Sequence, residues 1–135
     1  MGWGNSGVWI VKGRLALMTS RHPVTLEKSQ DHICVIANGE IIADSRRALV
    51  VHERGHSPVF YLPSEDVRRE AFQQTSHQTH CPYKGDATYW TITIGDSSLE
   101  NAAWSYEDPI SQVAGLKGYF AFYTDKVDLQ VNPVN

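Results

Sequence analysis

The sequence predicts a mainly β protein, built either as a compact antiparallel barrel or as two packed sheets, with one short α-helix near residues 64–74. Three observations predict this fold class. Short runs of β-branched and aromatic residues follow one another closely, turn-forming residues separate the runs, and apolar residues recur at helical spacing in one segment. Closely spaced strands accompanied by a single helix are typical of antiparallel all-β architectures.

Two hairpins are predicted in the first half of the chain. The stretch "ICVIANGEIIAD", which begins at Ile33, places two apolar runs around Asn38-Gly39. This pair is preferred in two-residue hairpin turns because both turn positions need a positive φ. Farther along, the predicted strands 48–53 and 59–62 flank "RGHSP", a stretch of turn-forming residues. We therefore expect two successive antiparallel pairs.

One helix and four further strands follow. In "LPSEDVRREAF", Ser64 occupies the position of an N-cap, the next two residues are acidic, and apolar residues recur at helical spacing. The segment 87–94, "ATYWTITI", alternates between two faces, with Tyr89 and Trp90 on opposite ones. The remaining strands are expected at residues 102–106, 118–123 and 127–131.

The chain length indicates a single domain. A chain of 135 residues, 41% of them hydrophobic, has the size of one globular unit with one core. We expect an N-terminal leader and first strand over residues 1–21 and one β domain over residues 22–135. The opening "MGWGNS" fits the N-myristoylation pattern M-G-x-x-x-[ST] through Gly2 and Ser6. Because the bulky Trp3 follows the acceptor glycine, we interpret this stretch as part of the leader.

Composition excludes several classes of partner. The formal net charge of -3 lacks the basic excess that nucleic-acid binding normally requires, so no nucleic-acid partner is expected. No apolar run approaches the ~18 residues of a membrane helix, so we expect no membrane span. The two cysteines, Cys34 and Cys81, are too few for a disulfide framework and favour free thiols and a cytoplasmic location. The sequence carries no prediction of oligomeric state.

Five strings carry a family resemblance: "NGEIIADS", "YLPSEDV", "CPYKGDATYW", "AWSYEDP" and "GYFAFYTDKV". In order and spacing they resemble the family known as domain of unknown function 427, over residues 22–131. The resemblance implies a compact β fold similar to the two-sheet β-tent arrangement. In related tents an aromatic cage binds a small cyclic ligand, which is an analogy because fold alone does not fix function.

The family is sometimes labelled nucleotidyltransferase-like. Phosphoryl-transfer proteins normally carry a glycine-rich phosphate loop or paired acids that hold magnesium, and the sequence has neither pattern. Its residues therefore give no support to that activity.

The string "HCPYKGDATYW" places Cys81, Tyr83 and Lys84 directly before a predicted strand. In a functional interpretation Lys84 binds an anionic ligand, Tyr83 stacks on it or donates a hydrogen bond, and Cys81 is a nucleophile. In a structural interpretation Pro82 and Gly85 form a tight turn, Cys81 is a small core residue and Lys84 is solvated. The structural interpretation is favoured for Cys81, and both stay open for Lys84.

Glu53, at the end of the predicted strand 48–53, is a candidate general acid or base, or a counter-charge for Lys84. The histidines of "HQTHC", His77 and His80, do not have the spacing of a helical zinc pair, and no further ligand has a defined position. We therefore predict neither a metal nor another cofactor.

We conclude that the sequence favours a small-molecule-binding domain with an aromatic-walled pocket bordered by the C-P-Y-K-G loop. Two alternatives stay open: an enzyme of transferase or hydrolase type that uses Cys81 or Lys84 with Glu53, and a protein-interaction module. The predicted ligand-binding residues are Glu53, Tyr61, Tyr83, Lys84, Trp90, Trp104 and Tyr106.

Overall fold

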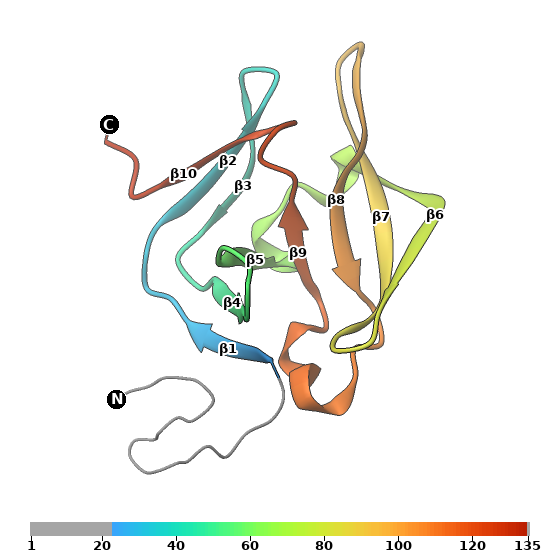
Figure 1. Cartoon of the computed structure of the whole chain (residues 1–135). Helices are drawn as coiled ribbons and strands as arrows, with labels where there is room; N and C mark the ends of the chain where they lie inside the picture. The colour runs from blue at the N-terminus through green and yellow to red at the C-terminus, as the bar shows by residue number, and fades with distance from the viewer. Residues whose placement is uncertain (1–22, 135) are drawn as a thin grey trace.

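The computed structural model describes residues 23–134, which form two antiparallel β-sheets (Figure 1). The large sheet has seven strands in the order β1 (Val24–Lys28), β4 (Leu49–Glu53), β5 (Val59–Pro63), β9 (Tyr119–Phe122), β8 (Ser97–Tyr106), β7 (Gly85–Ile94) and β6 (Phe72–Cys81). The small sheet has the order β10 (Asp128–Val131), β2 (Ile33–Ala37) and β3 (Glu40–Ser45). The predicted mainly β class is therefore confirmed, in its two-sheet form. The predicted leader, residues 1–21, lies outside the described residues.

Both predicted hairpins are present. Asn38 and Gly39 have φ values of 49° and 81° and join β2 to β3, as an Asn-Gly hairpin turn requires. The second hairpin pairs β4 with β5 in antiparallel register. Local turn chemistry thus sets the first part of both sheets.

The predicted helical segment is present but is shorter than expected and consists of 3-10 turns. It comprises η1 (Ser64–Asp66) and η2 (Arg69–Ala71), after which Phe72 begins β6 instead of continuing a helix to residue 74. Phe72 pairs with Ile92 of β7 and is buried between the sheets, so strand pairing overrides the helical spacing. A third helical segment, η3 (Ser111–Leu116), lies between the strands predicted at residues 102–106 and 118–123.

The large sheet carries an apolar cluster on each face. Strand β9 shows this directly, because Phe120 and Phe122 pack toward the small sheet while Tyr119 and Ala121 pack on the opposite face. The second face, which we call the outer face, carries a separate apolar cluster closed at one end by Val113 and Leu116 of η3. The candidate ligand-binding residues are divided between these two faces.

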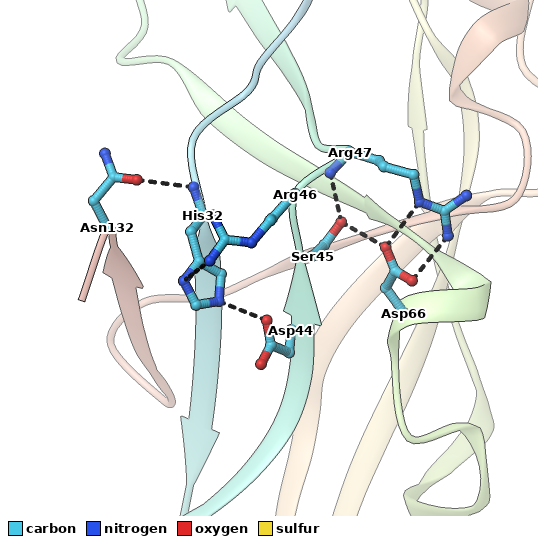
Figure 2. Close-up of polar contacts among 7 residues, drawn as sticks. All are labelled: His32, Asp44, Ser45, Arg46, Arg47, Asp66 and Asn132. Carbon is cyan, nitrogen blue, oxygen red and sulfur yellow. Dashed lines mark hydrogen bonds and ion pairs between the residues drawn. The ribbon is translucent and has the colours of Figure 1, made fainter. Parts of the chain in front are cut away.

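An ion pair anchors η1 to the end of β3 (Figure 2). The Asp66 carboxylate accepts hydrogen bonds from the Arg47 guanidinium at 2.8 Å and 3.3 Å and from Ser45 Oγ at 2.7 Å. The hydrogen bond from Arg47 is the main reason that the pKa of Asp66 lies below its usual value. Asp66 therefore has a structural role in holding η1 against the small sheet.

A second polar cluster joins β2, β3 and the end of β10. His32 Nε2 contacts Asp44 Oδ1 at 2.6 Å, and the backbone N–H of His32 donates to Asn132 Oδ1 at 2.9 Å (Figure 2). Ser45 follows Asp44, but its hydroxyl donates to Asp66 instead of His32. These side chains do not form a serine-histidine-aspartate triad.

Among residues 23–134, no helix has the length and apolar character needed to cross a membrane.

Candidate functional site

Six aromatic side chains form a continuous row of ring contacts on the outer face. We call this set the aromatic row, and in order it contains Tyr106, Tyr61, Trp104, Tyr123, Tyr89 and His77. The successive ring centroids are 6.4, 6.2, 4.5, 6.3 and 4.5 Å apart. The row therefore crosses the sheet from β5 to β6.

A small residue in the middle of the sheet makes this row possible. In cross-strand register Trp104 of β8 is opposite Tyr89 of β7 on one side and Ala121 of β9 on the other. Because Ala121 has only a methyl group, the indole reaches across β9 to β5. There Trp104 Nε1 donates a hydrogen bond to Tyr61 Oη at 3.0 Å.

Burial raises the pKa of three phenols in the row. Desolvation is the largest cause that raises the pKa of Tyr61, Tyr106 and Tyr123 above the ordinary phenol value. Tyr61 and Tyr106 are buried, whereas 36% of Tyr123 is exposed. The row thus runs from a closed end at Tyr106 to an open end where Tyr123 and His77 are exposed.

An ion pair lies at the closed end. Lys84 Nζ donates to Glu53 Oε1 at 2.8 Å, and only 13% and 21% of the two side chains are exposed. The same ammonium lies 5.8 Å from the centre of the Tyr106 ring. The structure therefore brings together five of the predicted ligand-binding residues, which are Glu53, Lys84, Tyr61, Trp104 and Tyr106.

The hairpin turn of residues 82–84, between β6 and β7, holds Lys84 in this position. The Lys84 N–H donates to Cys81 O at 3.1 Å, and Lys84 O accepts from the Ile110 N–H at 3.0 Å. Gly85 follows with φ of 120°, and a Cβ there would lie 3.3 Å from Asp108 O. The C-P-Y-K-G string is thus a turn docked against the start of the η3 loop.

Two candidate residues are placed elsewhere, and a third lies near the closed end of the row. Trp90 lies on the opposite face of the large sheet, buried between the two sheets, where its Nε1 donates to Ser105 Oγ at 2.9 Å. Tyr83 lies at the tip of the hairpin and is 44% exposed. Cys81 is a free thiol, half-buried at the end of β6, and it contributes to the raised pKa of Tyr61 and Tyr106, which places it near the closed end of the row.

An open groove of about 310 Å³ lies at the other end of the row. It is lined by His77, Tyr89, Asn101, Tyr123, Asp125 and Lys126. Sequence reasoning did not select this groove. The signal for Tyr89 was available, because strand alternation already placed it on the face opposite Trp90. Nothing in the sequence marked Asn101 or Asp125, since the fold brings them together from a strand bulge and a turn.

Some polar atoms of the groove form hydrogen bonds within the protein and others do not. Tyr123 Oη donates to Tyr89 Oη at 3.3 Å, and Thr75 Oγ1 donates to Asn101 Oδ1 at 2.7 Å. Lys126 Nζ donates to the Glu100 carbonyl at 2.7 Å. Among the described residues, neither the Asp125 carboxylate nor the Asn101 NH₂ group has a hydrogen-bond partner or an ion pair.

The structure gathers no metal-ligand set of three or more histidine, cysteine, aspartate or glutamate residues in the part of the chain that it describes. His80 Nδ1 instead contacts Asp86 Oδ1 at 2.7 Å across the β6–β7 hairpin, and His77 packs edge-on against Tyr89. These histidines therefore serve cross-strand contacts.

Comparison with known proteins identifies a family. The sequence model described as domain of unknown function (DUF427) matches residues 25–133. A search of curated proteins returned no match.

Proposed function

This chain belongs to the DUF427 family, and we propose that it is a small-molecule-binding domain whose ligand lies on the outer face of the large sheet. The ligand occupies the groove beside Tyr123 and Tyr89. The C-P-Y-K-G turn and its Glu53–Lys84 ion pair border the opposite end of the same aromatic wall.

The single observation that carries this proposal is the unbroken aromatic row that ends in an open groove. Small-molecule sites are commonly concave, lined by aromatic side chains, and supplied with a few polar groups that fix orientation. The groove has this composition, with Tyr89 and Tyr123 as aromatic lining residues and Asn101 and Asp125 as polar groups. Its volume of about 310 Å³ suits a ligand with a single ring system.

Residues farther along the row support this floor. Trp104 lies with its ring centroid 4.5 Å from that of Tyr123, and its N–H is held by Tyr61. Because the Trp104 ring contacts Tyr123 and is itself held by the buried Tyr61, these neighbours fix the orientation of the partly exposed Tyr123 ring. Preorganised side chains lose less conformational entropy on binding.

The geometry favours binding over catalysis by Lys84. An ammonium that donates to a carboxylate at 2.8 Å has no free electron pair with which to attack a substrate. Glu53 Oε1 is likewise engaged as its partner. The ion pair therefore supports a role in holding the hairpin turn beside the aromatic wall.

We also propose a cytoplasmic location. Both cysteines are free thiols, as is common in proteins of reducing compartments.

A ring-compound fragment library tests the function. Binding is followed by two-dimensional NMR of the aromatic side chains, which separates Tyr123 and Tyr89 from other residues. Two variants then locate the site: Tyr123→Leu in the groove and Tyr83→Leu at the hairpin tip, whose side chains have similar exposure. We expect Tyr123→Leu to weaken binding of the selected fragments by about tenfold and Tyr83→Leu to leave it unchanged.

The two variants distinguish three outcomes. A loss of binding in Tyr83→Leu alone would move the ligand to the hairpin tip and refute the groove as its site. Failure of every fragment to shift groove resonances in a folded protein would overturn the binding function. Loss in Tyr123→Leu alone supports the proposal.

A further inference from the structure

We infer that the groove takes a ring-bearing cation, a planar aromatic or heteroaromatic ring with a protonated nitrogen group, and that Asp125 is its counter-charge. This inference rests on the proposed binding function and specifies the chemical class of the ligand.

The state of Asp125 is the first argument. Its side chain is exposed in the turn after β9 and lines the groove, yet it forms no hydrogen bond or ion pair with the described residues. The adjacent Lys126 does not neutralise it, because Lys126 Nζ is bound to the Glu100 carbonyl. A carboxylate without a protein partner beside a concave surface is free to pair with a cation from solution.

The tyrosine rings are the second argument. Tyr89 and Tyr123 are nearly parallel, with an interplanar angle of 11° and ring centroids 6.3 Å apart. Aromatic faces carry negative potential and attract cations, so these rings and the Asp125 carboxylate favour the same sign of ligand charge. Burial and the contacts with Tyr89 raise the pKa of the Tyr123 phenol, and the nearby Asp125 carboxylate raises it further.

Asn101 supplies an orienting group. Its side-chain oxygen accepts from Thr75 Oγ1, which fixes the amide and leaves its NH₂ donors without a partner among the described residues. Those donors are suited to an acceptor atom on the ligand ring. A ring that carries a protonated nitrogen at one edge and an acceptor at another thus satisfies Asp125 and Asn101 together.

Lys126 is the opposing influence. Lys126 lines the groove and donates to a carbonyl, and its ammonium favours an anionic ligand. We give it less weight because one of its donors is already used, whereas the Asp125 oxygens have no partner among the described residues. The sign of the preferred ligand charge decides between the two influences.

Three probes of nearly identical shape measure which sign of ligand charge the groove prefers. Benzamidine, benzamide and benzoate each combine one ring with a planar head group, and their charges at neutral pH are positive, neutral and negative. Dissociation constants come from NMR titration of the Tyr89 and Tyr123 ring signals. We expect benzamidine to bind about fivefold more tightly than benzamide, the size of one partly exposed charge contact, and benzoate to bind most weakly.

A matched pair of variants tests the role of Asp125. Asp125→Asn and Asp96→Asn remove the same formal charge, but Asp96 is an exposed residue in the turn between β7 and β8 and does not line the groove. We expect Asp125→Asn to make benzamidine and benzamide equal and Asp96→Asn to keep the fivefold preference.

Other results overturn the inference in distinguishable ways. Equal binding of benzamidine and benzamide in the native groove, or tighter binding of benzoate, would refute the cation preference but leave the binding function standing. If the cation preference survives in Asp125→Asn, the assignment of Asp125 as the counter-charge is refuted, while the binding function stands. If none of the three probes shifts the groove signals and the fragment library also fails there, the binding function is lost as well.

Discussion

The Glu53–Lys84 ion pair provides a quantitative test of how the closed end of the aromatic row is held. Replacing Glu53 by glutamine keeps the shape of the side chain but removes the charge opposite the Lys84 ammonium. The Lys84 side chain is only 13% exposed, and its ammonium lies beside the Tyr106 ring. We therefore expect Glu53→Gln to destabilise the protein, because a partly desolvated charge loses its partner.

The burial of the pair sets the magnitude. Removing one partner of a fully buried pair costs about 3 to 5 kcal/mol, and fully exposed pairs contribute about 0 to 1 kcal/mol. Exposures of 13% and 21% place this pair nearer the buried limit. Because the glutamine oxygen still accepts a hydrogen bond, we expect a loss of about 2 to 3 kcal/mol. For a domain of this size the melting temperature falls by roughly 6 to 15 °C.

Urea denaturation of a double-mutant cycle measures the pair itself. Lys84→Met keeps an unbranched apolar side chain at this position and leaves the Glu53 carboxylate without its ammonium partner. The double variant, which has neither charge, should be more stable than the sum of the single losses by about 1 to 2 kcal/mol. A coupling near zero, or a loss below about 1 kcal/mol in Glu53→Gln, would refute the reasoning from burial.

A second ion pair serves as the control. Arg68 Nη1 and Glu40 Oε1 are 2.9 Å apart, nearly the same distance as in the Glu53–Lys84 pair, but 43% and 52% of their side chains are exposed. We expect Glu40→Gln to leave the free energy of unfolding almost unchanged. A loss as large as that of Glu53→Gln would show that distance, and not burial, determines the effect.

Three further predictions concern the rest of the fold. Asp66 has a folded-state pKa held below its unfolded value by Arg47, so its stabilising contribution is present above about pH 4 and is lost as the pH falls through the lower folded value. Urea unfolding should therefore show a larger loss in Asp66→Asn at neutral pH than at about pH 3, and equal losses would contradict this. Trp90→Ala should cost about 3 to 5 kcal/mol in thermal or urea unfolding, since the indole is buried between the sheets, and a loss near zero would argue against that placement. Thiol titration under denaturing, non-reducing conditions should find two free groups, and in the native protein Cys34, whose pKa is raised by burial, should react more slowly than Cys81; finding no free thiol would show a disulfide.

Local signals explain which parts of the fold could be predicted from sequence. The Asn38-Gly39 turn needs only its own two residues to adopt a positive φ, so its hairpin was predictable. The strand at 87–94 was predictable for a similar reason, because its alternation of large residues does not depend on the rest of the chain. The hairpin turn and the strand are each determined by a few consecutive residues.

The features that could not be predicted depend on distant partners. Strand β6 contains mainly polar residues that remain exposed at the edge of the sheet, so no apolar alternation marks it, and pairing with β7 creates it. The helix predicted over residues 64–74 was too long because its prediction used local spacing alone. Phe72 is stabilised more by pairing with β7 and by burial between the sheets than by continuing the helix. Trp90 and Trp104 were predicted to share one pocket. They lie on opposite faces of the sheet, because in the register of β7 and β8 Trp104 is opposite Tyr89 and not Trp90.

The two ends of the aromatic row differ in the polar groups that remain available, and this difference places recognition at one end. At the closed end the Lys84 charge is paired, and Tyr106 and Tyr61 are buried. At the groove, Tyr123 is partly exposed and Asp125 has no partner among the described residues. Since a ligand gains most where polar groups lack partners and rings are accessible, the closed end stiffens the wall and the groove contacts the ligand. A variant of Glu53 that remains folded should therefore still bind ring compounds in the groove.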